Sequence, residues 1–425
     1  MSRSLNVSPN RRFLTLPDGA PFFYLADTAW ELFHRPTLAD AELYLRDRAA
    51  KRFTAIQAVA LAEYDGLTQP NANGDLPFEE LDVTRPGEAY WRHVDAVVAL
   101  ANDLGLWLAL LPTWGDKWNK QWGIGPEIFT LERAAIYGEW IGARYRAAKI
   151  IWMLGGDRAV DTAAQAAIIR AMAAGVRRGD GGRHLMTFHT QGQRSSAEFF
   201  HDDDWLDFNT LQSGHTRDRD SYRSVAEDYA RSPVKPCMDA EPGYEDHPIG
   251  FDLANGYLDA DDVRKFAYWG LLAGGFGHTY GCHDIWQFLD PARNPPITHA
   301  RTPWHAALDL PGAGQMAHVR ALFELRQDRA PDQSLVQNDA GEGGAHIAAA
   351  LADDRSYAIV YIPDGRPTTI DLLRLGGERV AAEWRDPRSG ERREIGVFER
   401  TMLQPFVPPS AGHGQDWALL LTIDD

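Results

Sequence analysis

Two carboxylates that each follow a short apolar run are the residues best suited to chemistry in this sequence. Asp157 closes the run 150–157, and Glu241 closes the run 236–241, directly before Pro242. If both runs are buried parallel strands, both acids emerge at the carboxyl edge of one sheet, where barrel enzymes build their active sites. Paired carboxylates in an aromatic-lined cleft are the groups that a glycosidase uses. The pattern therefore predicts a glycosidase pair, provided that the fold brings the two strands together.

Each acid also has an ordinary structural explanation. Asp157 could form an ion pair with Arg158 or cap the following helix, and Glu241 could be a helix-start carboxylate. A function of another class is also open, namely a carbohydrate- or matrix-binding protein whose barrel is inactive. In a glycosidase, carboxyl groups about 5–5.5 Å apart indicate a retaining mechanism, and a separation of about 6.5–9.5 Å indicates inversion.

Apolar runs alternate with amphipathic segments along residues 1–330. The predicted strands cover residues 22–26, 55–61, 106–111, 150–154, 184–188, 206–211, 235–240 and 277–281. The predicted helices cover residues 38–51, 88–104, 131–147, 162–177, 219–231, 261–273 and 313–326. This α/β alternation predicts a (β/α)₈ TIM barrel with loop insertions. The rival fold, an open doubly wound sheet, lacks its glycine-rich dinucleotide fingerprint after the first strand.

The character of the sequence changes after residue 330. Residues 331–425 hold short segments rich in Val, Ile and Thr, such as 357–362 and 417–421, separated by turn-forming residues such as 363–365. This pattern predicts a small all-β sandwich domain that follows the barrel. Because no exposed aromatic row or basic patch is evident there, a module that supports the barrel is favoured over a ligand-binding one.

Side chains at the other predicted strand ends form a candidate substrate-binding shell, since polar groups there can bond sugar hydroxyls and tryptophan can lie under a sugar ring. These residues are Asp27, Trp30, Glu63, Tyr64, Trp114, Lys117, Trp118, His189, Gln191, Gln212, His215, His278 and Tyr280. His278 and Tyr280 are expected to donate hydrogen bonds to Glu241 and keep it ionised. Asp157 needs a raised pKa, from burial or from the charge of Asp27 or Glu241.

The composition and the apolar runs of the sequence restrict which partners the protein is expected to have. The net charge of −17 repels phosphate backbones, so nucleic acid is not an expected partner. No apolar run reaches the length of a membrane span, and the first residues lack the apolar region of a signal peptide. The chain as it stands is expected to be cytoplasmic, or periplasmic or secreted if a leader was removed. The oligomeric state stays open.

No cofactor or metal is expected from the sequence. The run His201–Asp204 is not expected to bind a metal. Consecutive side chains point in different directions, and no calcium-loop spacing surrounds the run. The two cysteines, Cys237 and Cys282, match no metal or redox motif and are expected to be reduced core residues.

Three stretches carry a family resemblance: residues 23–30, 151–157 and 239–245. In this order, each at the end of a predicted strand, they resemble the apiosidase-like family, glycoside hydrolase family 140. That family joins a catalytic barrel to a C-terminal β-sandwich labelled collagen-binding. The resemblance covers nearly the whole chain, and two of its motifs contain Asp27 and Tyr244, which are therefore also expected at the substrate site.

The resemblance implies a retaining hydrolase with an aspartate acid/base after the fourth strand and a glutamate nucleophile after the seventh. Those roles fall on Asp157 and Glu241. The implied activity is release of a terminal β-linked D-apiofuranose from plant glycans or glycosides. Another furanosidase, such as an arabinofuranosidase, and a non-catalytic carbohydrate-binding protein remain the alternatives.

Overall fold

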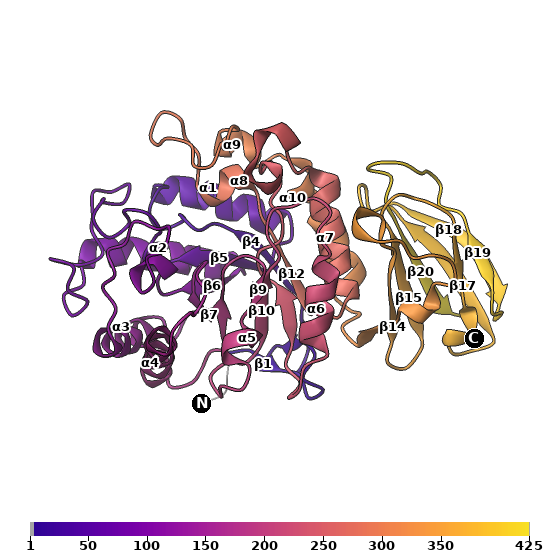
Figure 1. Cartoon of the computed structure of the whole chain (residues 1–425), viewed down its shortest axis with the longest axis horizontal. Coiled ribbons are helices and arrows are strands. Elements are labelled where there is room, and N and C mark those ends of the chain that lie inside the picture. The colour runs from indigo at the N-terminus through magenta and orange to yellow at the C-terminus, as the bar shows by residue number, and fades with distance from the viewer. Residues whose placement is uncertain (1–3, 425) are drawn as a thin grey trace.

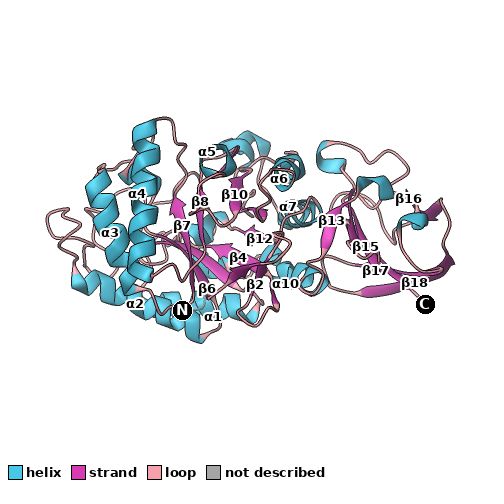
Figure 2. Cartoon of the chain, turned by 90° about the horizontal axis from the view of Figure 1, so that it is seen from below, coloured by secondary structure: helices cyan, strands magenta, loops and turns pink. Residues whose placement is uncertain are grey.

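The computed structural model describes residues 4–424, which form an α/β barrel followed by an antiparallel β domain (Figure 1). A small N-terminal sheet precedes the barrel and consists of β1 (Asn6–Val7), β2 (Leu14–Thr15) and β3 (Pro21–Phe22). Helices surround the barrel strands, as the view from below shows (Figure 2). Of the helices within these residues, none is long and apolar enough to cross a membrane.

The barrel is built, within residues 4–424, from eight strands that match the eight predicted ones. They are β4 (Tyr24–Thr28), β5 (Ala55–Val59), β6 (Trp107–Leu111), β7 (Ile150–Gly155), β8 (Met186–His189), β10 (Asn209–Gln212), β11 (Cys237–Asp239) and β12 (Gly277–Tyr280). Six of them form a parallel sheet in the order β12-β4-β5-β6-β7-β8. The other two, β10 and β11, pair in parallel, and the short β9 (Arg194–Ser195) adds to β10 in antiparallel orientation. The predicted fold class is confirmed.

A few isolated hydrogen bonds close the barrel where regular strand pairing is interrupted. Between β8 and β10, the Thr187 and Thr210 hydroxyls donate to the carbonyls of Phe208 and Phe188 at 2.7 and 2.6 Å. Between β11 and β12, the amide of Phe276 donates to the carbonyl of Cys237 at 3.1 Å. Side-chain hydroxyls thus satisfy backbone acceptors at the seam, as buried carbonyls require.

The helices cover the outside of the strands. The long ones are α1 (Leu38–Ala50), α2 (Glu88–Asp103), α3 (Leu131–Arg144), α4 (Ala163–Asp180), α6 (Ser221–Tyr229), α7 (Ala260–Leu272) and α10 (Pro311–Phe323). The short ones are α5 (Ala197–Phe200), α8 (His283–Trp286) and α9 (Trp304–Ala307). Capping boxes begin α1, α4 and α7, where the side chains of Thr37, Thr162 and Asp259 accept backbone N–H groups. These caps explain why the helices begin close to the predicted positions.

The C-terminal domain has one large antiparallel sheet and a small second layer. Its strands are β13 (Arg329–Pro331), β14 (Ala348–Ala352), β15 (Tyr357–Ile362), β16 (Thr368–Ile370), β17 (Arg379–Arg385), β18 (Arg392–Glu399), β19 (Gln404–Phe406) and β20 (Trp417–Ile423). The large sheet has the order β13-β14-β15-β20-β17-β18, and β16 pairs with β19. Alternate residues of its central strands face opposite ways: Ile359 and Leu420 join the barrel core, whereas Val360 and Leu421 join the core of the domain itself. The sheet is therefore buried on both faces and packs directly on the barrel.

A buried ion pair joins the two domains. The guanidinium of Arg264 on α7 donates to Asp416 at 3.0 and 2.8 Å, and the Tyr361 hydroxyl donates to the same carboxylate at 3.0 Å. The rings of Tyr268 and Tyr361 stack at 4.5 Å beside it. Because α7 lies between the strands β11 and β12, this contact supports the side of the barrel that carries Glu241.

Removal of this contact has a predictable cost. Asp416→Ala removes the closest carboxylate partner of the buried Arg264 guanidinium and leaves it only Asp261 at 3.3 Å and Gln315 at 2.7 Å. We therefore expect a loss of about 3 kcal/mol in the free energy of unfolding, the lower end of the range for a broken buried ion pair. Asp424→Ala, which breaks an exposed pair with Arg379, is the matched control and is expected to cost about 0–1 kcal/mol. Denaturant unfolding of both variants measures the difference. Equal losses would contradict a structural role for the interdomain pair.

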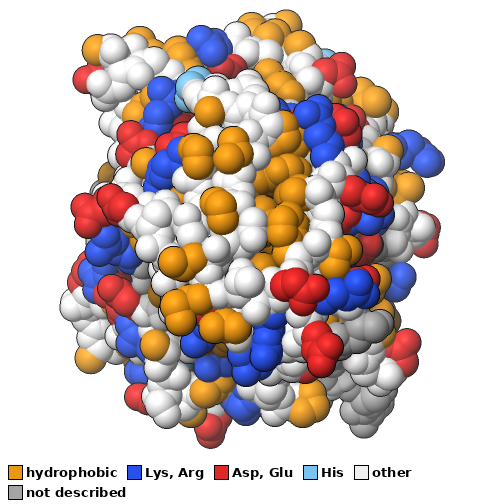
Figure 3. All heavy atoms as spheres, turned by 90° about the vertical axis from the view of Figure 1, so that its right-hand side faces the viewer, with side chains coloured by type: hydrophobic (Ala, Val, Ile, Leu, Met, Phe, Trp, Pro, Cys, Tyr) orange, Lys and Arg blue, Asp and Glu red, His pale blue; other side chains and the backbone are white. Residues whose placement is uncertain are grey.

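Hydrophobic side chains gather on the outer end of the C-terminal domain (Figure 3). The exposed large hydrophobic residues of this domain are Leu373, Val397, Met402, Leu403 and Val407. They belong to β18 and to the segments that adjoin the small sheet of β16 and β19, on the side of the domain opposite the barrel.

Candidate active site

A pocket of about 530 Å³ lies at the carboxyl ends of the barrel strands. Loops that follow all eight strands contribute to it, as expected for the catalytic end of such a barrel. Its lining residues are Trp30, Glu63, Tyr64, Trp114, Trp122, Asp157, Gln191, Gly192, Gln193, Gln212, Gly214, His215, Thr216, Arg219, Glu241, Tyr244, His247, Gly250, Phe251, His283, Trp286 and Thr298. The volume suits a small ligand such as a sugar and part of its neighbour.

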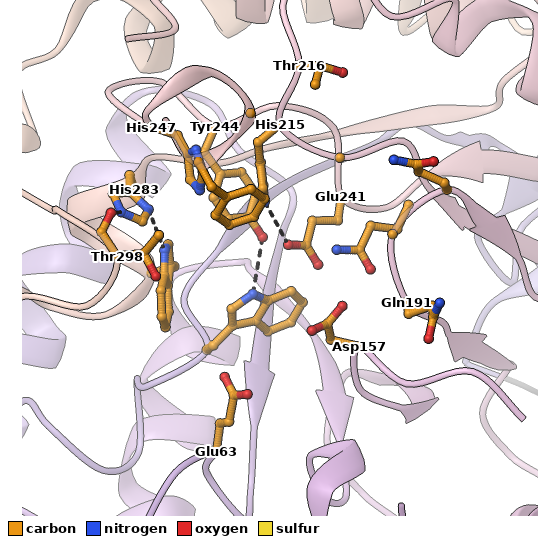
Figure 4. A pocket seen from close by; sticks show the side chains of 18 of the residues that line it. Glu63, Asp157, Gln191, His215, Thr216, Glu241, Tyr244, His247, His283 and Thr298 are labelled. Carbon is orange, nitrogen blue, oxygen red and sulfur yellow. Dashed lines mark hydrogen bonds and ion pairs between the residues drawn. The ribbon is translucent and has the colours of Figure 1, made fainter. Parts of the chain in front are cut away.

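The two predicted carboxylates meet in this pocket. Asp157 follows β7 and Glu241 follows β11, and Figure 4 shows their carboxyl groups pointing toward one another. Asp157 also contacts Arg158, whose Nη1 atom lies 3.2 Å from its carboxylate. Asp157 therefore forms the ion pair with Arg158 that the sequence suggested and also lines the pocket.

The backbone around Asp157 is unusual. Gly155 and Gly156 have φ angles of +97° and +108°, and Asp157 itself has a φ of +47°. A Cβ atom on Gly156 would lie 2.8 Å from the amide nitrogen of Gly115 and 2.9 Å from the Cα of Trp114. Two glycines therefore let the chain turn sharply off β7 and direct the acid into the pocket, and a left-handed aspartate is strain of the kind found at functional sites.

A substitution of Gly156 is expected to displace the acid. Gly156→Ala combines the positive φ with a backbone clash, so we expect hydrolytic activity to fall about 10²-fold through misplacement of Asp157. Gly182→Ala is the matched control, because its φ is +69° but nothing lies within 4 Å of the added Cβ. Both variants should lose some thermal stability, and only Gly156→Ala should lose activity. Equal activities in steady-state assays would contradict this positional role.

Two histidines hold Glu241 as a carboxylate. The Nε2 atoms of His189 and His215 lie 2.9 and 3.5 Å from its two oxygens. Although burial opposes the charged form, these donors lower the pKa of Glu241 to about 2. The backbone amide of Asp157 donates a hydrogen bond to the Nδ1 atom of His189 at 3.3 Å. Nδ1 as acceptor places the His189 proton on Nε2, toward Glu241.

The pKa of Asp157 is shifted in the opposite direction from that of Glu241. Burial raises its pKa to about 6, the charge of Glu241 adds to the rise, and Arg158, His189 and Gln212 offset part of it. Opposite shifts in one pocket are the signature of a proton donor beside an ionised carboxylate. Glu241, rather than Asp27, supplies the neighbouring negative charge that the sequence interpretation required.

A third acid, Glu63, lines the same pocket. Burial and the charge of Asp157 raise its pKa to about 8, with Arg158 opposing the rise from 3.6 Å away. Glu63 is therefore protonated at neutral pH and can act as a hydrogen-bond donor. The structure also places Trp30, Tyr64, Trp114, Gln212 and Tyr244 in the pocket lining, and the Tyr244 hydroxyl accepts a hydrogen bond from Trp30 Nε1 at 3.1 Å.

His278 and Tyr280 are not the donors to Glu241 that the sequence suggested. Tyr280 donates its hydroxyl to Glu245 at 2.6 Å, and His278 is buried without lining the pocket. Side chains alternate along a strand, and Tyr280 on β12 packs with the outer core between strands and helices. The expectation was wrong because a residue on the strand next to Glu241 can reach it only from the inner face of the barrel, and Tyr280 lies on the outer face.

Asp27 was also expected at the substrate site and does not line the pocket, because it too lies on the outer face of its strand. It lies beside Tyr280 in the register of β4 and β12, fully buried and facing α1. There it forms an ion pair with Arg48 and accepts the Tyr44 hydroxyl at 2.7 Å. Asp27 therefore anchors α1 to the barrel and does not contact the pocket.

Three other predicted shell residues lie outside the pocket lining, and one of them, His189, still contacts Glu241. Trp118 is buried and directs Nε1 toward the carbonyl of Gly155 at 3.4 Å, so it supports the end of β7. Lys117 is buried and its ammonium group bonds Asp116 and the carbonyl of Tyr64 at 2.9 Å each. Trp118 and Lys117 stabilise the loops that shape the pocket.

Several pocket residues were missed because they lie on long loops without a periodic pattern. They are Trp122, Gln193, Thr216, Arg219, His247, Phe251, His283, Trp286 and Thr298. On one wall His247 stacks on His215 at 4.1 Å, and His283 accepts the Trp286 Nε1 hydrogen at 3.1 Å. Burial lowers the pKa of His283 to about 4 and also lowers the pKa of His247, so these two imidazoles are neutral at neutral pH. The sequence feature that could have pointed to these residues is the presence of aromatic side chains shortly after the predicted strand ends.

Outside the pocket, a group of acidic and histidine side chains within residues 4–424 has the spacing of metal ligands. The group consists of Asp259, Asp261 and His413, whose side-chain atoms are close enough together to hold an ion. It lies outside the pocket lining, and Asp261 already contacts Arg264 at 3.3 Å and Lys265 at 3.4 Å.

Known families match both parts of the chain. A model described as "Apiosidase-like, catalytic domain" matches residues 8–328, and one described as "Putative collagen-binding domain of a collagenase" matches residues 330–422. The chain belongs to the apiosidase-like family. The apiosidase-like match covers the strands that carry Asp157 and Glu241, and it identifies the protein as a glycoside hydrolase that acts on carbohydrate.

Solved structures agree with this membership of the apiosidase-like family. One described as a glycoside hydrolase is 31% identical, with a TM-score of 0.90 over 99% of this chain and 97% of that one. A family 5 glycoside hydrolase from Bacteroides vulgatus is 32% identical, with a TM-score of 0.91 over 99% and 94% of the two chains. Another structure from that organism, described as "a putative glycoside hydrolase", is 16% identical and shares the fold, with a TM-score of 0.70 over 99% of this chain and 82% of that one. A search of curated proteins found no match.

Proposed function

We propose that this enzyme is a retaining glycosidase in which Glu241 is the nucleophile and Asp157 the acid/base. The observation that carries the proposal is the pair of opposite pKa shifts in one pocket, to about 2 for Glu241 and to about 6 for Asp157. A retaining enzyme needs one ionised and one protonated carboxyl group beside the glycosidic bond. The shared contact with His189 supports the positioning of both groups.

The reaction then proceeds in two displacements. Glu241 attacks the anomeric carbon and forms an ester bond, while the bond to the leaving oxygen breaks and Asp157 gives that oxygen its proton. The ester removes the charge of Glu241, and Asp157 is left as a carboxylate. Asp157 next takes a proton from water, whose oxygen attacks the anomeric carbon and releases Glu241. The anomeric configuration is retained because it inverts twice.

A terminal sugar is the proposed substrate unit. Loops from all eight strand ends surround the pocket, and on one side the aromatic residues His247, Phe251 and Trp286 form its wall. Such a wall leaves room for the end of a chain instead of a passing polymer. Membership of the apiosidase-like family favours a β-linked D-apiofuranose, from plant glycans or glycosides, with another furanose such as arabinofuranose as the second candidate.

A panel of aryl glycosides tests the substrate. We expect turnover of the β-D-apiofuranoside by the wild-type enzyme and much slower turnover of the α-L-arabinofuranoside and of hexopyranosides. Glu241→Gln, assayed in parallel, shows that any turnover comes from this site. Preference for a hexopyranoside would contradict the furanose proposal, and preference for the arabinofuranoside would replace apiose with arabinose.

The pH dependence of kcat/KM follows from the two carboxyl groups. Glu241 is ionised above a pKa of about 2, and Asp157 keeps its proton below a pKa of about 6. We therefore expect kcat/KM to decline by about tenfold per pH unit once the pH exceeds about 6, as the acid loses its proton. Initial rates measured from about pH 4 to about pH 9 follow this limb of the profile. A kcat/KM that rises through neutral pH would contradict the assignment of the acid.

A further inference from the structure

Trp122 is an exposed aromatic residue at the rim of the pocket. Its side chain is 61% exposed, yet the residue lines the pocket that holds Asp157. The guanidinium of Arg158 lies over the indole ring, 4.2 Å from its centroid. Arg158 in turn donates to the carbonyl oxygen of Asp157 at 2.7 Å. The exposed ring is therefore held directly beside the proposed acid.

The loop that carries Trp122 is tied to the segment after β7. Asn119 donates its side-chain amide to the carbonyl of Ala159 at 3.1 Å, and Gln121 donates to Asp161 at 2.8 Å. The amide of Gly125 donates to Asp116 at 2.9 Å at the far end of the loop. An aromatic side chain on a loop held in this way is pre-organised, which lowers the entropic cost of binding a ligand against it.

The direction of the leaving group follows from the proposed chemistry. The acid must lie beside the oxygen of the bond that breaks, so the leaving group extends past Asp157 and away from the wall formed by His247 and His283. Figure 4 shows Gln191 on that side of Asp157, opposite the two histidines. Gln191 accepts the amide hydrogen of Ala159 at 3.2 Å, which orients its side chain next to the acid.

We propose that Trp122, together with the amides of Gln191 and Gln193, forms a subsite that binds the leaving group as a sugar ring. This inference rests on the proposed roles of Asp157 and Glu241. One face of the indole is covered by Arg158, which leaves the other face for a ligand. An aromatic face bordered by amide groups matches a sugar, which has an apolar ring face and hydroxyl groups at its edge. A purely aromatic leaving group would use the indole and leave the amides unpaired.

Reactivation of a trapped glycosyl-enzyme tests this subsite separately from the chemistry. A 2-deoxy-2-fluoro furanosyl donor of the preferred sugar forms the intermediate, excess donor is removed, and recovery of activity is followed in buffer alone or with an added acceptor. The acceptors are methyl glycosides of several pentoses and hexoses, with benzyl alcohol as the aromatic comparison. The variants are Trp122→Ala, Trp122→Phe and the control Ile124→Ala, whose residue is exposed on the same loop but does not line the pocket.

We expect at least one sugar acceptor to accelerate reactivation of the wild-type enzyme and of Ile124→Ala with saturation. Once the rate of each variant in buffer alone is subtracted, Trp122→Ala should raise the acceptor concentration for half-maximal reactivation by about tenfold, and Trp122→Phe should largely restore the wild-type value. A response to benzyl alcohol alone, no response to any sugar, or equal behaviour of Trp122→Ala and wild type would overturn the sugar subsite. Failure to form any intermediate would instead overturn the double displacement, and the subsite with it.

Discussion

Glu241→Gln is expected to lower kcat for hydrolysis by about 10⁴-fold or more, because the amide cannot form the glycosyl ester. The substitution keeps the shape of the side chain and leaves an oxygen that can accept a hydrogen bond from His189 or His215. Folding should therefore be preserved, and circular dichroism and thermal unfolding confirm that. Steady-state rates on the preferred furanoside measure the loss.

A matched control lies four residues further along the chain. Glu245 is also buried, but it bonds Tyr280 and the amide of Gly312 and does not line the pocket. Glu245→Gln is expected to keep activity within about one order of magnitude, since its effect is structural. Comparable losses in the two variants would mean that burial of a glutamate, and not its place in the pocket, determines the effect.

Asp157→Ala is expected to have an effect that depends on the leaving group. General acid catalysis contributes about 10²–10⁴-fold, so glycosides with poor leaving groups should slow by that factor. A dinitrophenyl glycoside, whose leaving oxygen needs no proton, should be cleaved to the glycosyl-enzyme at close to the wild-type rate. Because the variant lacks Asp157, its kcat/KM for the dinitrophenyl glycoside should also show no decline above the wild-type Asp157 pKa of about 6.

Deglycosylation gives this variant a second readout. Asp157 is also the proposed base toward water, so an intermediate should accumulate and appear as a burst of dinitrophenol. Azide, which needs no base, should accelerate its breakdown. A uniform loss across all leaving groups, with no burst, would show that Asp157 supports the structure of the pocket without transferring a proton.

The barrel could be predicted because each strand run and helix period is local in the sequence. The predicted strands 150–154 and 277–281 nearly coincide with β7 (Ile150–Gly155) and β12 (Gly277–Tyr280). The bounds of shorter strands were predicted less exactly. The run 206–211 corresponds to β10 (Asn209–Gln212), whose regular pairing with β11 begins only at Asn209, while hydroxyl contacts supplement the backbone bonds at the seam next to β8. Such bounds depend on tertiary contacts that no local pattern encodes.

The carboxylate pair was predictable for a related reason. The carboxyl ends of parallel strands meet at one end of a barrel, so strand assignment alone places Asp157 and Glu241 together. The orientation of Asp27 and Tyr280 was not predicted, although the alternation of Tyr24, Ala26 and Thr28 with Leu25 and Asp27 contained the information. Asp27 lies on the helix-facing side, where Arg48 neutralises its charge.

The contacts of His189 and His215 and the course of the pocket loops could not be predicted from the sequence. His189 was placed at a strand end, but its link between Glu241 and the backbone of Asp157 depends on contacts across three strands. Trp122 lies on a loop whose course is set by bonds to Ala159 and Asp161. Loop geometry of this kind arises from the assembled barrel end and carries no periodic signal.

Mass spectrometry of the trapped enzyme tests the central claim most directly. The enzyme is treated with a 2-deoxy-2-fluoro furanoside that bears a good leaving group, then digested, and its peptides are compared with those of untreated enzyme. The account predicts that the peptide containing Glu241 gains the mass of one fluorosugar, and that fragmentation places the addition on this residue. A label on another residue, or release of a product with inverted configuration and no label, would contradict it.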